Sequence, residues 1–173
     1  MLSNCEGING LYYIENYLDE YNLNDVKKFI QNVNLEHIGN RASRRVAHYG
    51  YYYSYDRSGL KTAPQIPVEL NNLIYLPLLN DVNFDQIIIN EYKPGQKIAY
   101  HTDHQTLFGP IIACITVGQE VPIYFKYGKE IKQVIPKEGS MYIMTGEGRY
   151  KWQHMSNNDT SGTRYSITYR TIN

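Results

Sequence analysis

The chain has 173 residues, of which 42% are hydrophobic and 20% charged, and its 17 Lys and Arg residues balance its 17 Asp and Glu residues. This length suffices for one domain with its own core, and no apolar run approaches the ~20 residues of a membrane-spanning helix. Two cysteines cannot supply a disulfide framework, and a net charge of zero leaves nucleic-acid binding to local patches. Because the first residues resemble no export signal, we expect a protein of the cytosol or nucleus that is neither secreted nor bound to membranes. We also expect a monomer.

The amino-terminal half predicts one strand and two helices. Residues 11–18 favour a short strand, and Asn24 is a suitable cap for a helix over 25–33 whose apolar residues share one face. A second helix is expected over 68–75, because Pro67 suits a first helical turn. No repeat or low-complexity linker interrupts the chain, so residues 1–173 are interpreted as a single domain.

From residue 86 onward the pattern changes to short β-branched and aromatic runs separated by turn residues, which is typical of strands. The runs are QIIINEY, KIAYH, IIACITVG, VPIYFKYG, EIKQVIP, KEGSMYIMTG, RYKWQHM and TRYSITYR. About eight strands over residues 86–172 favour a compact β-sandwich or barrel. The predicted fold class is therefore α+β, with amino-terminal helices packed on a jelly roll, or double-stranded β-helix.

A candidate metal site begins where the KIAYH run ends. His101 and Asp103 are two residues apart, so both side chains leave a strand on the same face. His154, in the RYKWQHM run, lies in a strand that a jelly roll could bring alongside. Two imidazoles and one carboxylate form the ligand set of non-haem Fe(II) oxygenases, with zinc as the rival metal. The dyad alone fits a His and an Asp in a turn equally well, and we expect His104 to be an exposed loop residue on the opposite face.

A row of polar side chains occupies alternate positions of the last predicted strand. The row consists of Arg164, Ser166, Thr168 and Arg170. Because a buried, unpaired guanidinium is costly, an inward-facing row favours an anionic ligand such as a dicarboxylate. Either both arginines lean towards one ligand, or one binds the ligand while the other contacts a metal-binding carboxylate. An exposed strand face is the remaining interpretation.

The order of these motifs resembles the AlkB family of Fe(II)- and 2-oxoglutarate-dependent dioxygenases over roughly residues 10–172. The motifs are Asn90-x-Tyr92-x-x-Gly95, His101-x-Asp103, His154 and Arg164-x-Ser166-x-Thr168-x-Arg170. The resemblance implies that His101, Asp103 and His154 are the catalytic residues that bind Fe(II), and that 2-oxoglutarate and O2 are cosubstrates. It also implies a 2-oxoglutarate site formed by Asn90, Tyr92, Arg164, Ser166, Thr168 and Arg170. Ser166 stands where many relatives have an asparagine.

Two further segments bear on the substrate. Within the family, SRRVAHYGY and MTGEGRYKWQH are most similar to the homologue that modifies wobble uridines in tRNA, and the second is also similar to repair-type members. The implied function is oxidative demethylation of N-alkylated nucleobases in DNA or RNA. The alternatives are hydroxylation of a modified tRNA wobble uridine, a protein-directed hydroxylase or demethylase, and a cupin-like binding module without catalysis.

The segment ahead of the core, residues 41–57, reads RASRRVAHYGYYYSYDR, and the resemblance implies a lid over the substrate nucleotide. In an extended chain, Tyr49, Tyr51, Tyr53 and Tyr55 would share one face. An aromatic row beside Arg44 and Arg45 suits an extruded base and its phosphates, so the candidate substrate residues are Arg44, Arg45, Tyr49, Tyr51 and Tyr53. Cross-strand packing in a Tyr-rich chain is the alternative. The expected partner is single-stranded or flipped-out nucleic acid that carries an alkylated or modified base.

Overall fold

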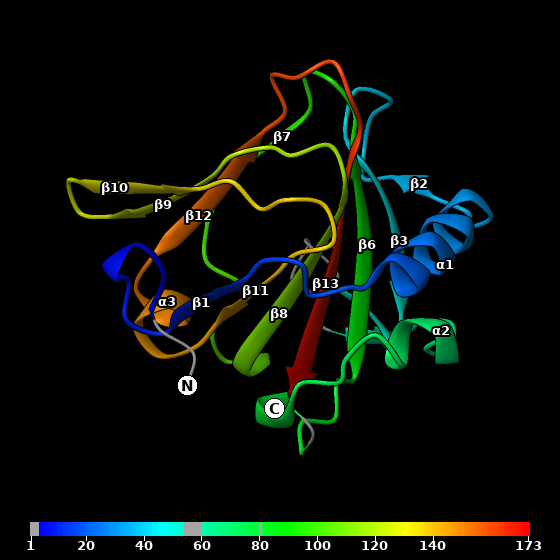
Figure 1. Ribbon diagram of the computed structural model, residues 1–173, viewed down its shortest axis with the longest axis horizontal. Coiled ribbons are helices and arrows are strands. Elements are labelled where there is room, and N and C mark those ends of the chain that lie inside the picture. The colour runs from blue at the N-terminus through cyan, green and yellow to red at the C-terminus, as the bar shows by residue number, and fades with distance from the viewer. Residues whose placement is uncertain (1–3, 54–59, 80) are drawn as a thin grey trace.

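The computed structural model describes residues 4–53, 60–79 and 81–173, and most of its strands belong to two antiparallel sheets (Figure 1). The larger sheet has seven strands in the order β1-β11-β8-β13-β6-β3-β2, and the smaller has four in the order β10-β9-β12-β7. Strands β4 and β5 form a separate pair. No helix in these described ranges is long and apolar enough to span a membrane.

The elements have the following bounds. The large sheet contains β1 (Leu11–Ile14), β2 (Glu36–His37), β3 (Arg45–Tyr49), β6 (Gln86–Tyr92), β8 (Phe108–Gly118), β11 (Met141–Met144) and β13 (Arg164–Ile172). The small sheet contains β7 (Lys97–His101), β9 (Ile123–Tyr127), β10 (Glu130–Val134) and β12 (Gln153–Asn157), and the separate pair is β4 (Tyr51–Tyr53) with β5 (Leu60–Thr62). The helices are α1 (Glu20–Gln31), α2 (Val68–Asn71) and α3 (Gly146–Tyr150), with 3-10 turns at Cys5–Gly7 and Pro77–Leu79.

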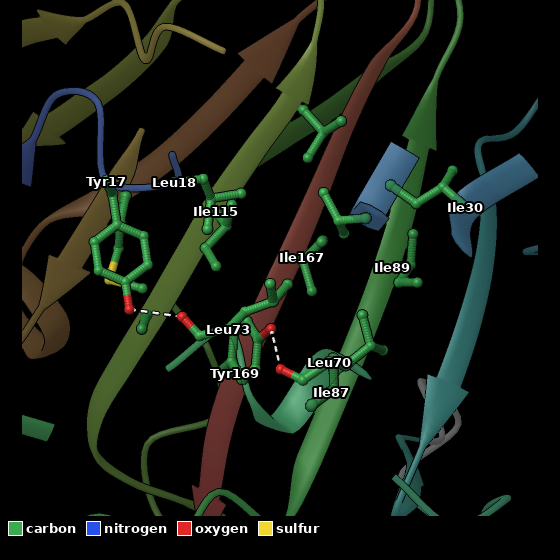
Figure 2. Packing of buried hydrophobic residues seen from close by; sticks show 14 of the residues in the cluster. Tyr17, Leu18, Ile30, Leu70, Leu73, Ile87, Ile89, Ile115, Ile167 and Tyr169 are labelled. Atoms are coloured by element: carbon green, nitrogen blue, oxygen red, sulfur yellow. Dashed lines mark hydrogen bonds between the residues drawn. The ribbon is translucent and has the colours of Figure 1, made fainter. Parts of the chain in front are cut away.

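One face of the large sheet forms a dry core beneath α1 and α2 (Figures 1 and 2). Ile87 and Ile89 of β6 and Ile167 of β13 are completely buried in this cluster. Figure 2 shows two tyrosines that satisfy carbonyl groups within it: the Tyr17 hydroxyl donates to Leu73 O and the Tyr169 hydroxyl donates to Leu70 O. The helices are therefore attached to the sheet by apolar burial and by buried polar contacts.

The opposite face of the large sheet turns towards the small sheet. A second cluster lies between them, with Ile112 and Cys114 from β8 and Phe125 from β9 among its buried members. Strand β6 is buried along its whole length, because its odd residues face the helices and its even residues face this inner space. The eight strands from β6 to β13 confirm the predicted jelly roll and the α+β class.

Several predicted boundaries in the amino-terminal half are wrong. The first strand ends at Ile14, because Asn16 adopts a left-handed φ of 53° that breaks the extended run. Helix α1 begins at Glu20, where the Asp19 side chain accepts a hydrogen bond from Asn22 N, so Asn24 lies inside the helix. Helix α2 ends at Asn71, four residues before the predicted end at 75.

The RYKWQHM run also differs from its prediction as a continuous strand. Arg149 and Tyr150 close helix α3, and the strand begins only at Gln153. Gly148 fixes this helix against the amino-terminal strand, because a Cβ at that position would lie 3.1 Å from the backbone of Gly10 and Leu11. A contact between segments so far apart in the sequence leaves no local signal.

The predicted tyrosine row is interrupted at Gly50. This residue adopts a φ of 78°, and a Cβ there would collide with Asp85 O, so only glycine fits the corner between β3 and β4. Tyr49 therefore belongs to β3, whereas Tyr51 and Tyr53 belong to β4, which pairs with β5. The prediction that these three share one face of one strand is wrong. Tyr55 and the remainder of the expected lid, residues 54–57, lie outside the described residues.

Candidate active site

A cavity of about 340 Å³ opens between the two sheets and is lined mainly by β6, β7, β12 and β13. The even residues of β13 form one wall, with Arg164, Ser166 and Thr168 buried and Arg170 partly exposed. The predicted inward-facing row is therefore present. Strand β6 adds to this wall because it pairs with β13 in a register that places Asn90 opposite Ser166 and Tyr92 opposite Arg164. Directly paired residues point to the same face of the sheet.

Two histidines lie side by side at one end of the cavity. His154 on β12 pairs directly with His101 on β7, and their ring centroids are 4.3 Å apart. Burial, followed by the charge of His101, lowers the pKa of His154 to about 3. His154 is therefore neutral near pH 7, which is the protonation state in which an imidazole binds a metal.

Asp103 lies at the same end of the cavity, two residues beyond the end of β7. Its Oδ1 accepts a 2.7 Å hydrogen bond from Arg170, whose other terminal nitrogen donates to Gln86 Oε1. Burial raises the pKa of the Asp103 carboxyl. The charges of Arg170 and then His154 lower the pKa by more than burial raises it, and the result is a pKa of about 2. The carboxylate is therefore ionised and held in place by the partly exposed cation of Arg170.

The backbone next to Asp103 is held by a second buried arginine. Arg149 of α3 is 2% exposed and donates 2.9 Å hydrogen bonds to the carbonyl oxygens of Asp103 and His104. Weaker contacts of 3.4 Å reach Phe108 O and Gly109 O. The loop that carries Asp103 is thus fixed through its main chain as well as through its side chains.

The candidate metal ligands lie in the same cavity but do not surround one point. Within the described ranges, no group of three or more His, Cys, Asp and Glu side chains is arranged to hold a metal ion. Nδ1 of His101 lies 2.8 Å from Ala99 O, and Asp103 directs Oδ1 at Arg170. These contacts engage one atom of each side chain, so they are compatible with metal binding through His101 Nε2 and Asp103 Oδ2.

The other end of the cavity contains a cation with few partners. Arg164 is 2% exposed and donates one hydrogen bond, of 3.2 Å, to Thr116 Oγ1, while its guanidinium lies over the Tyr92 ring. Its buried Nε has no hydrogen-bond partner among the described residues. Nearby, Asn90 donates to Ser166 Oγ at 3.2 Å. Because a buried guanidinium is costly without an anion, this end of the cavity fits a carboxylate.

The structure separates the candidate substrate residues into two groups. Arg44 and Tyr53 line the cavity, and Arg44 donates a 3.1 Å hydrogen bond to Asn90 Oδ1. Arg45 points to the other side, where it forms two 2.7 Å hydrogen bonds with Glu91. Tyr49 packs against Phe29 of α1. Tyr51 is 37% exposed and does not line this cavity.

Sequence reasoning missed several residues of this cavity. Tyr142 and Met144 line it from β11, and their alternate positions in that strand were a usable signal. His104 is exposed, as expected, but it borders the cavity instead of facing away, with its ring 6.4 Å from Tyr53. Arg149 gave no local signal, because its role depends on the packing of α3 against the Asp103 loop.

A jelly roll with paired histidines, an ionised carboxylate and a buried, incompletely paired guanidinium is typical of the non-haem iron oxygenase class. The 2OG-Fe(II) oxygenase superfamily matches residues 10–170, and the chain belongs to that superfamily. It is a dioxygenase that depends on Fe(II), 2-oxoglutarate and O2.

Curated relatives include tRNA (carboxymethyluridine(34)-5-O)-methyltransferase ALKBH8 of Mus musculus, 30% identical over 84% of this chain and 24% of the relative. The Xenopus tropicalis protein of that name is 33% identical over 64% of this chain and 19% of its own length, so the chain spans about a fifth to a quarter of these proteins. Uncharacterized protein L905 of Acanthamoeba polyphaga mimivirus is 27% identical over 99% of this chain and 89% of its length. The solved structure of OsALKBH1 shares the fold, with a TM-score of 0.77 at 13% identity over 99% of this chain and 100% of that one.

Proposed function

We propose that this dioxygenase oxidises alkyl groups on nucleobases, with oxidative demethylation of N-alkylated bases in DNA or RNA as its reaction. The observation that carries the proposal is the position of Arg44 and Tyr53 at the same cavity that contains His101 and His154. A cation beside an aromatic ring suits an extruded base with its phosphate. The similarity to ALKBH8 proteins supports a nucleic-acid substrate.

We assign the Fe(II) site to His101, Asp103 and His154. Support comes from the direct pairing of the two histidine strands, the low pKa of His154 and the ionised state of Asp103. Neutral imidazoles and a carboxylate are the donors that this metal takes in the facial arrangement. Arg170 orients the carboxylate from behind, so it acts as a positioning residue for this site.

We assign the distal carboxylate of 2-oxoglutarate to Arg164, because its Nε lacks a partner within the described chain and its side chain is buried. Asn90, Tyr92, Ser166 and Thr168 line the same wall and complete the cosubstrate site. Arg170 already pairs with Asp103. Arg164 therefore binds the ligand, and Arg170 supports the carboxylate of Asp103 that binds the metal.

When bound, the iron and the cosubstrate supply insertion of one oxygen atom from O2 into a C–H bond, while the other oxygen converts 2-oxoglutarate to succinate and CO2. The residues of this chain orient both partners and exclude water. An alkyl group on a ring nitrogen then leaves as an aldehyde after hydroxylation, because the resulting hemiaminal is unstable. On a carbon-linked side chain, the same chemistry gives a stable alcohol.

A second candidate is hydroxylation of a modified wobble uridine in tRNA. The observation in its favour is the similarity to proteins named as tRNA carboxymethyluridine methyltransferases, together with the matching SRRVAHYGY segment. A protein-directed hydroxylase is the third option, which the position of Arg44 and Tyr53 disfavours.

Under each of these options we propose that residues 1–173 form a single catalytic domain with a substrate lid at about 41–57. We also propose that the protein acts as a monomer in the cytosol or nucleus.

The test is mass spectrometry of nucleic acids after incubation with the enzyme, Fe(II), 2-oxoglutarate and ascorbate. The substrates are methylated DNA and RNA oligonucleotides, tRNA with modified wobble uridines, and methylated peptides. Loss of the methyl mass, with release of formaldehyde, supports demethylation, whereas a gain of one oxygen atom on tRNA supports the second candidate. Oxidation of peptides alone would contradict the nucleic-acid proposal.

A further inference from the structure

A second cavity, of about 370 Å³, lies next to the first, beside the open edge of β3. Tyr53 lines both cavities, so its ring is part of the wall between them. Strand β2 covers only Arg45 and Val46 of β3. The remainder of that edge, from Ala47 to Tyr49, forms the floor of the second cavity together with residues from β4.

The two cavities share one face of the large sheet. His48 on β3 pairs with Ile88 on β6, and Ile88 in turn pairs with Thr168 on β13. Directly paired residues point to the same face, and both Ile88 and Thr168 line the first cavity. His48 lines the second. A polymer that fills the first cavity can therefore continue along this face into the second.

His48 offers an unused hydrogen-bonding group there. Its Nε2 is buried and has no partner in the described part of the chain. Burial, followed by the charges of Arg170 and Arg44, lowers the pKa of His48 to about 4. The imidazole is thus neutral near pH 7 and can donate or accept one hydrogen bond at the edge of a planar ring.

The remaining walls favour an uncharged aromatic ring over a phosphate. Tyr52 is 41% exposed, and its ring centroid lies 5.3 Å from that of His48, which leaves an accessible aromatic surface. Glu36 lines the cavity, and none of its described lining residues is Lys or Arg. The carboxylate of Glu36 disfavours a phosphate at this wall and suits the amino groups of a base.

We propose that the second cavity is a subsite for the nucleobase adjacent to the target base, on one side of it along the strand. The proposal rests on the proposed nucleic-acid function and adds a neighbour-recognition site to it. Tyr53 separates the two bases, Tyr52 stacks on the neighbour and His48 hydrogen-bonds its edge. Such stacking selects for the presence of a base more strongly than for its identity.

The experiment uses single-stranded DNA and RNA oligonucleotides with one central N-methylated base. In matched oligonucleotides an abasic site replaces the base on the 5′ side or on the 3′ side. The variants are Tyr52→Ala and His48→Leu, with Tyr21→Ala as the matched control on α1, where that side chain is 74% exposed. Oxidation gives kcat/KM, and 2-oxoglutarate consumption without substrate checks that each variant retains an intact iron site.

In the wild type and in Tyr21→Ala, we expect an abasic site on one side to lower kcat/KM by about 5- to 150-fold, and on the other side to have little effect. Tyr52→Ala should lower kcat/KM for the intact oligonucleotide and should lose most of the abasic penalty. His48→Leu should raise KM with kcat nearly unchanged, because the contact is the same in ground and transition states.

Two outcomes would overturn the subsite, and they differ from failure of the proposed function. If the wild type oxidises oligonucleotides equally well with either neighbour removed, the subsite is wrong and the proposed function stands. If Tyr52→Ala retains the full abasic penalty, a neighbour site exists elsewhere. If no oligonucleotide is oxidised while another substrate class is, the proposed function fails and the subsite falls with it.

Discussion

Strands β6 and β13 separate two regions that differ in almost every physical respect. On the helix side, Ile89 and Ile167 are completely buried in an apolar cluster. On the cavity side of the same two strands, Asn90 and Arg164 are nearly as buried, but they face polar neighbours and unfilled hydrogen-bonding positions. One side is a closely packed apolar core, and the other is the polar wall of a cavity.

The comparison shows how one strand can serve stability and function at once. Because side chains alternate along a strand, Ile167 can anchor the helices while Ser166 and Thr168 on either side of it line the cavity. The helix side obtains its free energy from burial without any ligand. The cavity side retains a buried cation at Arg164 that only an anion can fully pair. Substitutions on the two faces should therefore affect different measurements.

The largest effect is expected at the end of the cavity where the histidines meet. His154→Ala removes one neutral imidazole from the proposed ligand set, so iron binding and succinate formation should both be lost. Iron content after reconstitution and succinate yield measure the two effects. His37→Ala, which alters an exposed His on β2, should still bind iron. Full turnover in His154→Ala would rule out the assigned site.

Neighbouring isoleucines on β6 provide the next test. Ile89→Ala opens a hole in the completely buried helix-side cluster, so the free energy of unfolding should fall by about 2 to 5 kcal/mol. Ile88→Ala removes the same atoms beside an existing cavity and should cost less. Urea denaturation measures both. Equal losses of unfolding free energy in the two variants would contradict the contrast between the packed core on one face and the cavity wall on the other.

Substitutions of Arg164 should weaken ligand binding without lowering the stability of the fold. Arg164→Lys should weaken 2-oxoglutarate binding by about 10- to 100-fold, because an ammonium cannot reproduce the two parallel hydrogen bonds of a guanidinium. Arg164→Met should bind still less, yet unfold at the same or a higher urea concentration, because it removes an incompletely paired buried charge. Calorimetry and denaturation provide the data. Unchanged affinity in the Lys variant would refute the assignment.

The smallest effect concerns acid sensitivity and His48. Its folded-state pKa of about 4 lies below the ordinary value of 6.5, so the unfolded chain takes up the proton more readily and stability falls as pH drops through that interval. His48→Gln removes this contribution, so the difference between its unfolding free energies at pH 7 and pH 5 should be smaller than for the wild type. Parallel pH profiles would show that His48 is not held neutral.

Strand positions were predictable because their pattern is local. The continuous apolar run of β6 and the alternation of polar and apolar residues in β13 can each be read from the strand alone. Helix ends were less predictable: Asp19 and Asn24 are both good caps, and only the observed contact with Asn22 selects Asp19. Helix α3 depends on the close approach of Gly148 to Gly10, which no local pattern encodes.

The same distinction applies to the candidate site. The placement of His101, Asp103 and the polar row of β13 in one cavity followed from period-two spacing and strand pairing. Arg44 and Arg45 could not be told apart from the sequence, because the choice depends on Glu91, a partner on another strand. Gly50 explains the misplaced tyrosines, since its left-handed turn depends on the nearby backbone of Asp85.

Arg149 donates its hydrogen bonds to main-chain carbonyls, and this choice of acceptor affects how the loop can evolve. Every residue carries a carbonyl, so a substitution at Thr106 can leave the contacts of Arg149 with Asp103 O and His104 O in place. Gly109 is the exception, because a Cβ there would collide with Thr171 Oγ1. The loop can therefore change in sequence at Thr106 while the Asp103 carboxylate stays in place.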